Sequence, residues 1–275
     1  MKAKLGMSPI AWWNDDLPEL SDDVSLEECL RQSRSAGFTG MEQGRRFPNN
    51  PGEMLPILRA ADVTLCGGWF SGTLVDEDLA ANKDRIAPMI DLFKAVDAPC
   101  IVYGEVGRSI QGDRSRPLAT KTVLSDDEMK AYARKVTEFG EWCAGQGMPL
   151  SYHHHMAAVV QFEHELDAFM RHSGEGIPLL LDAGHLAFAG GDVLRAIDNH
   201  HRRINHVHVK DVRMDVIRRW TGRSNPSSMR WHSAPSPYRV TGRWISVRSC
   251  RNLPAMDMKA GSSSKPSRIR RRIRP

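Results

Sequence analysis

Short apolar runs alternate with longer amphipathic runs along the first 219 residues, and this alternation constrains the fold more than any other feature of the sequence. Seven runs have the length and apolar character of buried strands: 3–12, 38–44, 63–70, 99–106, 149–155, 177–186 and 204–212. Apolar residues recur at helical spacing in 25–37, 51–62, 76–96, 126–147, 161–173 and 191–203, and a seventh helix, 215–220, is cut short. Strict alternation predicts a parallel sheet covered by helices.

Eight such strand–helix units would close a (β/α)8 TIM barrel of about 250 residues. Seven are readable in this chain of 275 residues, and the eighth is missing. A doubly wound open sheet is the structural alternative, but no G-x-G-x-x-G follows the first strand, so it ranks below the barrel. We therefore expect an α/β fold in which residues 1–219 form an incomplete TIM barrel that carries the catalytic site.

Composition excludes several other classes of protein. The N-terminal residues lack the apolar segment of a secretory signal, and no run approaches the ~20 apolar residues of a membrane helix. The five cysteines contain no C-x-x-C pair, so neither a disulfide framework nor a zinc knuckle is indicated. We expect a cytoplasmic protein with reduced thiols and no membrane partner; a homo-oligomer is compatible with the sequence, which leaves the oligomeric state open.

The net charge of +5 is the sum of an acidic N-terminal part and a strongly basic C-terminal part of the chain. Up to Arg219 there are 25 Lys and Arg against 32 Asp and Glu, whereas from Trp220 onward there are 13 against Asp257 alone. Residues 220–275 show no sustained period and end in a Ser, Pro and Arg-rich stretch, which is typical of a disordered basic tail. The functional alternative is attachment to nucleic acid or a membrane surface through the arginines at 270–272.

Polar residues follow the apolar runs at the carboxyl ends of the last three predicted strands. His153, His154 and His155 end the fifth strand, Asp182 and His185 follow the sixth, and His206 and His208 belong to the seventh. In a barrel these ends surround one mouth. Imidazoles with a carboxylate form an open N/O site for Mn²⁺, Co²⁺ or Zn²⁺.

Each residue also has a structural interpretation. Asp182 follows a buried apolar run, where a carboxylate needs a partner or a ligand, whereas a hydrogen-bonded structural role is favoured for His206. Alternation lets His153 and His155 face one side while His154 faces the other, so at most two of the three join the site.

Further polar and aromatic residues lie near the same predicted mouth: Glu42, Tyr103, Glu105, Lys210, Arg213, Trp12, Trp13 and Trp69. The charged residues can orient the hydroxyl groups of a polar substrate or form a solvated rim, and the residues themselves do not decide between these alternatives. The tryptophans can wall a pocket, although core packing explains an aromatic residue more often.

Six motifs resemble, in order, those of the inosose dehydratases of myo-inositol catabolism, members of the sugar isomerase/AP-endonuclease-like barrel superfamily. The motifs are PIAWWNDDLPEL, AGFTGMEQGRRFP, VYGEVGRSIQGDRSRPL, YHHHMAAVVQ, LLLDAGHLAFAGGD and HVHVKDVR, and the resemblance covers about residues 2–219. It implies dehydration of scyllo-inosose, a cyclic polyhydroxy ketone, to a trihydroxycyclohexane-1,2-dione. Manganese or cobalt is the implied metal, and glutathione is a further implied requirement.

The superfamily's metal ligands, typically Glu, Asp, His and Glu, come from strands five to eight. The resemblance implies that the first three of these ligands correspond to His153, Asp182 and His208. This chain therefore has a histidine where the family has its first glutamate. We further expect His185 and Lys210 to assist proton transfer, and Glu42, Glu105, His155, Arg213 and Trp69 to contact the substrate. A keto-sugar isomerase or epimerase shares this chemistry, and an inactive or nucleic-acid-binding protein is the alternative outside the enzymes.

The fourth ligand, a glutamate of strand eight, is not readable in the chain. The genetic code leaves few possible codons for the segment Met256–Lys259. If the same nucleotides are translated in the frame that begins one base earlier, two of the resulting residues must be glycine and glutamate. Permitted codons onward give HGYEGWLVVEAEQDPA, which resembles the family's strand eight. We therefore hypothesise that residues 220–275 are a frameshifted translation of the end of the barrel. A frameshift accounts for the arginine-rich tail and so argues against nucleic-acid binding. It also predicts that the first and seventh strands have unpaired edges and that the activity of this chain is impaired.

Overall fold

Seven parallel strands form the sheet that the alternation predicts. The computed structural model describes residues 4–14, 23–113, 115–214 and 245–248. The strands are β1 (Lys4–Met7), β2 (Gly40–Gln43), β3 (Thr64–Gly72), β4 (Ile101–Glu105), β5 (Leu150–His153), β6 (Leu179–Asp182) and β7 (Ile204–Val209). Each is paired in parallel with the next along the chain. The prediction of seven parallel strand–helix units is confirmed for these strands.

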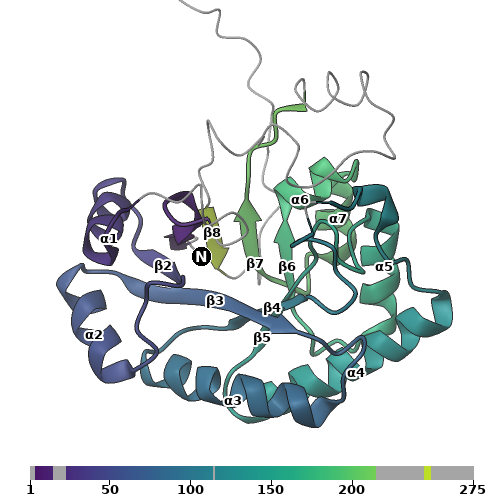
Figure 1. Ribbon diagram of the computed structural model, residues 1–275, viewed down its shortest axis with the longest axis horizontal. Coiled ribbons are helices and arrows are strands. Elements are labelled where there is room, and N and C mark those ends of the chain that lie inside the picture. Colours follow the sequence, from purple (N-terminus) through teal and green to yellow (C-terminus); the bar gives the residue numbers. More distant parts are fainter. Residues whose placement is uncertain (1–3, 15–22, 114, 215–244, 249–275) are drawn as a thin grey trace, which may run out of the picture.

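Helices connect the strands and cover the outside of the sheet (Figure 1). They are α1 (Leu26–Ser35), α2 (Pro51–Ala60), α3 (Leu79–Ala95), α4 (Asp126–Gly145), α5 (Glu163–His172), α6 (Ala183–Phe188) and α7 (Val193–His200), with short 3₁₀ turns at Pro9–Ala11 and Leu118–Thr120. Side chains fix several helix starts: Ser25 Oγ accepts a hydrogen bond from the Glu28 amide, and Ser125 and Glu128 form a reciprocal capping box. These caps satisfy amides that the first helical turn leaves without partners.

The core lies between the strands and the helices, where aromatic rings fill the space. Tyr152 of β5 stacks on Phe169 of α5, with ring centroids 3.9 Å apart, and Tyr103 of β4 packs on Phe139 of α4 and on Tyr152. All four side chains are almost fully buried. Burial of large apolar side chains fixes which face of each strand points outward, and so aims the alternate residues into the barrel.

An eighth strand, β8 (Ile245–Arg248), lies between the two ends of the parallel sheet. It pairs antiparallel with β1, where Leu5 faces Val247, and antiparallel with β7, where Val209 faces Ile245. The expectation that the edges of β1 and β7 stay unpaired is therefore wrong. A strand edge exposes a row of unpaired amide and carbonyl groups that an extended segment of either direction can satisfy.

The stretch after β6 also differs from the expectation. Residues 183–186 were expected to continue the sixth strand, but they begin helix α6, because Asp182 Oδ1 accepts a hydrogen bond from the His185 amide and acts as the N-cap. His185 consequently lies on the first turn of a helix and not on a strand.

The expected seventh helix at 215–220, and the basic tail apart from β8, lie outside the described residues. Apart from β8, the proposed disorder of residues 220–275 therefore stays a prediction, and so does the frameshift. Within the described part of the chain, no helix combines the length and apolarity needed to span a bilayer.

Candidate active site

Three of the expected site residues come from consecutive strands of the sheet. His153 ends β5, Asp182 ends β6, and His208 lies near the end of β7. The register places Asp182 directly beside His208 and His153 beside Leu180, two residues before Asp182. Parallel strands that end at one edge therefore bring two imidazoles and a carboxylate together.

The ligand atoms of these three residues converge on Asp182 Oδ2. His153 Nε2 lies 3.5 Å from it and His208 Nδ1 lies 3.4 Å from it. Both separations exceed an ordinary hydrogen bond, and they match the spacing of roughly 3.4 Å expected for donors about 2.1 Å from a tetrahedral ion. His153, Asp182 and His208 form a group of buried donors within 4.8 Å of one another, so their chemistry and spacing fit a divalent metal ion.

Lys210 and His185 complete the surroundings of the same carboxylate. Lys210 Nζ lies 2.7 Å from Asp182 Oδ2 and 2.6 Å from His185 Nε2. The close approach needs Gly184, because a Cβ at that position would clash with the side chain of Lys210. The two residues expected to assist proton transfer are thus in mutual contact beside the candidate ligands.

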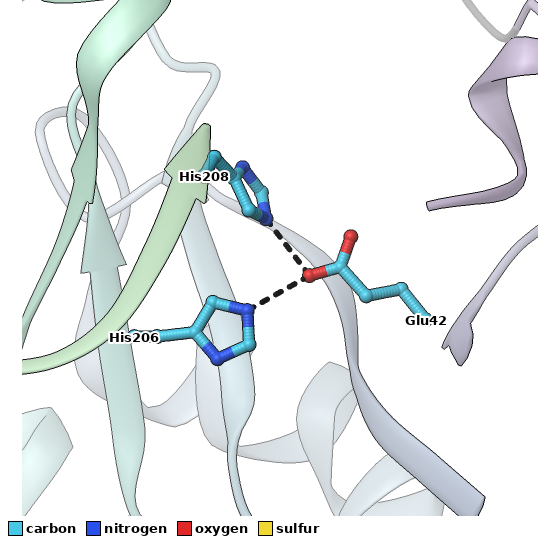
Figure 2. Close-up of side chains that lie close together, drawn as sticks. All are labelled: Glu42, His206 and His208. Carbon is cyan, nitrogen blue, oxygen red and sulfur yellow. Dashed lines mark hydrogen bonds and ion pairs between the residues drawn. The ribbon is translucent and has the colours of Figure 1, made fainter. Parts of the chain in front are cut away.

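Glu42 lies against two histidines of β7 (Figure 2). Its Oε1 atom is 2.8 Å from His208 Nε2 and 3.1 Å from His206 Nε2, and its side chain is 8% exposed. Glu42, His206 and His208 form a second group of donors within 4.8 Å of one another. Glu42 was expected at the substrate, whereas the described contacts place it beside a candidate ligand. The hydrogen-bonded role favoured for His206 agrees with its contact with Glu42.

Both buried carboxylates are held in the ionised form. Burial by itself would raise the pKa of Asp182, but the Lys210 ammonium holds that pKa well below its ordinary value of 3.8. Burial likewise opposes ionisation of Glu42, whereas His208 and His206 hold its pKa well below 4.5. Asp182 therefore offers an anionic oxygen to a cation.

The imidazoles fall into two electrostatic classes. Burial lowers the pKa of His153 to about 4, and it also lowers the pKa values of His155 and His185, so these rings are neutral. His206 differs: burial opposes its charge, yet contacts with Cys100 and Glu42 raise its pKa to about 10. Glu42 and Asp182 similarly raise the pKa of His208. Neutral His153 carries a lone pair suited to a metal ion.

The three consecutive histidines have three different environments. His153 reaches Asp182, and the ring of His155 lies 4.0 Å from that of His185. His154 Nε2 lies 3.2 Å from the backbone nitrogen of Asp182 and accepts its hydrogen bond. Only His153 of the three belongs to a described donor group.

Trp69 borders the cluster from β3. Its ring centroid is 5.6 Å from that of His153 and 5.7 Å from that of His155, and 38% of the residue is exposed. Trp69 lies over Gly104, where a Cβ would clash with the indole, and its Nε1 donates to Ser71 Oγ. A partly exposed aromatic ring thus stands beside the candidate ligands.

The described contacts of Glu105 lie outside this cluster. The Glu105 carboxylate is 1% exposed and accepts hydrogen bonds from Tyr103 Oη and the Gly107 amide, at 2.7 and 2.8 Å. It lies among the aromatic rings between β4 and the helices, so its described contacts do not support the expected role at the substrate. Arg213 is four residues beyond the end of β7 and partly buried, and its expected role at the substrate stays a prediction.

The loops after β4 and β5 are joined beside the histidines. Lys121 and Glu165 form an ion pair at 2.6 Å whose side chains are 2% and 6% exposed. The Ile110 amide donates to the Ala157 carbonyl, and Ala157 adopts a φ of 67°, which is uncommon for a residue with a Cβ. Sequence reasoning missed the pair of Lys121 and Glu165 because the two residues are 44 positions apart, one in the loop after β4 and the other on α5.

Comparisons with known proteins agree with the fold and the motifs. The family model described as the xylose isomerase-like TIM barrel matches residues 30–226. The rhizopine catabolism protein MocC of Rhizobium meliloti is 38% identical over 218 residues, which cover 79% of this chain and 67% of that protein. The inosose dehydratase of Clostridium perfringens (strain ATCC 13124) is 36% identical over 216 residues, covering 78% and 73% of the two chains.

Solved structures share the fold at low sequence identity. The probable 3-DHS dehydratase AsbF of Bacillus anthracis aligns with a TM-score of 0.56 and 14% identity, covering 76% of this chain and 73% of that one. The 3-keto-D-glucoside 4-epimerase YcjR of E. coli aligns with a TM-score of 0.57 and 15% identity, covering 76% and 80%. Dehydratases and epimerases therefore occur on the same barrel.

Proposed function

The chain belongs to the xylose isomerase-like TIM barrel family, and from this premise we propose that it removes water from scyllo-inosose with the help of a divalent metal ion. Its relatives named inosose dehydratase identify it as an enzyme of the hydro-lyase class. The proposed product is a trihydroxycyclohexane-1,2-dione. The observation that carries the proposal is the buried group of His153, Asp182 and His208 with the Lys210–His185 pair against the same carboxylate.

His153, Asp182 and His208 would hold the metal, and their nitrogen and oxygen donors suit Mn²⁺ or Co²⁺. When bound, the ion supplies Lewis-acid stabilisation of negative charge on the substrate's ketone oxygen. Asp182 contributes an anionic oxygen and His153 a neutral nitrogen. Burial of all three side chains keeps water from competing for these donors.

The reaction itself is a proton transfer followed by loss of a hydroxyl group. A base removes the proton from the carbon next to the ketone, the C–O bond at the following carbon breaks, and the departing hydroxide takes up a proton and leaves as water. His185 Nε2 and Lys210 Nζ, 2.6 Å apart, can exchange that proton between them. We assign proton transfer to this pair because no other described side chains beside Asp182 combine an acceptor nitrogen with an ammonium donor at hydrogen-bond distance.

The partly exposed Trp69 supports a ring-shaped substrate. In a scyllo-configured ring the hydroxyl groups are equatorial, so both faces of the ring present C–H groups that can pack on an aromatic surface. Trp69 stands edge-on to His153 and His155, which places an apolar wall next to polar groups. His155 would then orient a substrate hydroxyl from the side of His185.

Product analysis tests the proposal. Metal-free protein is supplied with Mn²⁺ and scyllo-inosose, with and without glutathione, and the product mass is measured. Loss of one water per substrate supports the proposed function. A product of unchanged mass would instead indicate a keto-sugar isomerase or epimerase, which uses the same proton transfer. Absence of metal binding and of any product would refute the proposal.

A further inference from the structure

The two ring nitrogens of His208 face two different carboxylates. Nε2 lies 2.8 Å from Glu42 Oε1, and Nδ1 lies 3.4 Å from Asp182 Oδ2. We propose that Glu42 is a positioning residue: it keeps the hydrogen of His208 on Nε2, so that Nδ1 faces the divalent ion. This inference rests on the proposed metal site at His153, Asp182 and His208.

The two nitrogens of the His208 ring differ in how closely they approach a carboxylate. Contacts of 2.8 and 3.1 Å between Glu42 Oε1 and the two histidines of β7 lie within the normal range of hydrogen bonds, whereas the contact of 3.4 Å on the Asp182 side lies beyond it. One carboxylate oxygen has two lone pairs and can accept from both histidines. Glu42 thus behaves as a hydrogen-bond acceptor of His206 and His208.

The chemistry of the carboxylate dictates which nitrogen carries the hydrogen. An ionised carboxylate can only accept, so the nitrogen that faces Glu42 at 2.8 Å must be an N–H. Metal-bound histidines commonly donate their other N–H to a carboxylate, which fixes the ring's orientation and tautomer. The pair of Glu42 and His208 has the geometry of such an arrangement.

The strands make this contact across the barrel. His206 and His208 are two residues apart on β7, so both side chains point the same way, and Glu42 reaches them from β2 (Figure 2). His206 Nε2 contacts the same oxygen as His208, and its Nδ1 lies 4.0 Å from Cys100 Sγ. The second histidine thereby fixes the position of the carboxylate that orients the first.

Metal affinity tests the inference directly. Mn²⁺ binding is measured by titration calorimetry on wild-type protein, on Glu42→Gln and on the control Asp167→Asn. An amide can present either an oxygen or an NH2 group, so the side chain in Glu42→Gln would no longer dictate the tautomer of His208, and affinity should fall about 10–100-fold. The control alters another carboxylate–histidine pair, Asp167 with His200 at 2.6 Å, between helices α5 and α7. It should bind Mn²⁺ like the wild type.

Three results would overturn the positioning role. Unchanged affinity of Glu42→Gln would show that Glu42 does not act on the metal. Equal losses in Glu42→Gln and Asp167→Asn would show a general loss of stability. Two ions per wild-type chain, one of them lost in His206→Gln, would make Glu42, His206 and His208 a second metal site.

The wild-type protein gives an independent readout that needs no variant. Long-range ¹H–¹⁵N spectra report which nitrogen of His208 carries hydrogen, in the metal-free protein and with diamagnetic Zn²⁺. The metal-free spectrum is recorded at a pH high enough for the ring of His208 to be neutral; Nε2 should then carry the only ring hydrogen in both states, and hydrogen on Nδ1 in either state would refute the inference. If the wild type binds no Mn²⁺, the proposed function fails, while the metal-free spectrum still decides whether Glu42 sets the tautomer.

Discussion

Replacement of Glu105 by glutamine should make the protein more stable at neutral and alkaline pH. Glu105 is 1% exposed at the end of β4, and it accepts hydrogen bonds from Tyr103 Oη and the Gly107 amide. Burial raises its pKa from the ordinary value of 4.5 to about 7, against the opposing effect of these hydrogen bonds. An uncharged glutamine of the same size can accept from the Gly107 amide with its Oε1 and donate from its Nε2 to Tyr103 Oη, without the cost of a buried charge.

The sign and size of the effect follow from proton linkage. Below about pH 4.5 the carboxyl is neutral in the folded and the unfolded chain, so it adds no pH dependence. Between pH 4.5 and about 7 the unfolded chain has lost the proton that the folded chain keeps, so the free energy of unfolding falls as pH rises. The pKa difference of about 2.5 is worth about 3 kcal/mol at most, since each pKa unit is worth 1.36 kcal/mol.

Urea unfolding of metal-free protein at several pH values measures this difference. The free energy of unfolding of Glu105→Gln minus that of the wild type should rise by about 3 kcal/mol between pH 4.5 and pH 8.5. Glu53→Gln, on the exposed face of α2, is the matched control, because it removes a carboxylate without changing a buried group. A difference that stays flat with pH, or that falls, would refute the raised pKa of Glu105.

The candidate active site and the end of the chain give four further predictions. His153→Ala should lose bound Mn²⁺, measured by elemental analysis, and undiminished occupancy would remove His153 from the ligand set. Lys210→Met should keep the metal but lower kcat about 10²–10⁴-fold, which a saturating dehydration assay would show. Trp69→Leu should raise KM roughly tenfold with kcat little changed, since about 1.4 kcal/mol of ring contact is lost. A frame-restored chain should be more active and melt at a higher temperature, by roughly 2–4 °C for each kcal/mol gained; equal melting and activity, or a gene whose other frame lacks these peptides, would contradict the frameshift.

The strands could be predicted because buried parallel strands leave a strong signal in the sequence. Short apolar runs such as Leu179–Leu181 are typical of strands that are buried on both faces of the sheet. The segments between these runs have apolar residues at helical spacing, which indicates that strands and helices alternate. Helix α6 was missed because its N-cap, Asp182, directly follows one of those runs, so the apolar character continues across the boundary. The sequence around β8 has no sustained hydrophobic periodicity that predicts a strand, so β8 is recognised only from its pairing with β1 and β7.

The direction in which each side chain leaves its strand explains which contacts of the candidate site could be predicted from the sequence. Strand order alone predicts that His153, Asp182 and His208 lie close together, because neighbouring parallel strands end at one edge. Glu105 was expected at the substrate, but alternation along the strand points the other way: it lies two residues after Tyr103, so both side chains point toward the helices. The contact of Glu42 with His208 joins residues 166 apart on strands that are not neighbours, and no local pattern predicts it.

The candidate ligands and their positioning residue depend on different parts of the barrel. His153, Asp182 and His208 lie on three consecutive strands, so their spacing rests on the pairing of β5, β6 and β7. Glu42 belongs to β2 and reaches His208 only across the interior, so its contact depends on how the rest of the barrel closes. Here the closing strand β8 runs antiparallel, and its residues Ile245–Arg248 include no carboxylate. Because His208 itself faces Ser246 of β8, a change at this end of the chain would shift both His208 and its contact with Glu42, so metal affinity should fall even though the sequence still contains all three ligands.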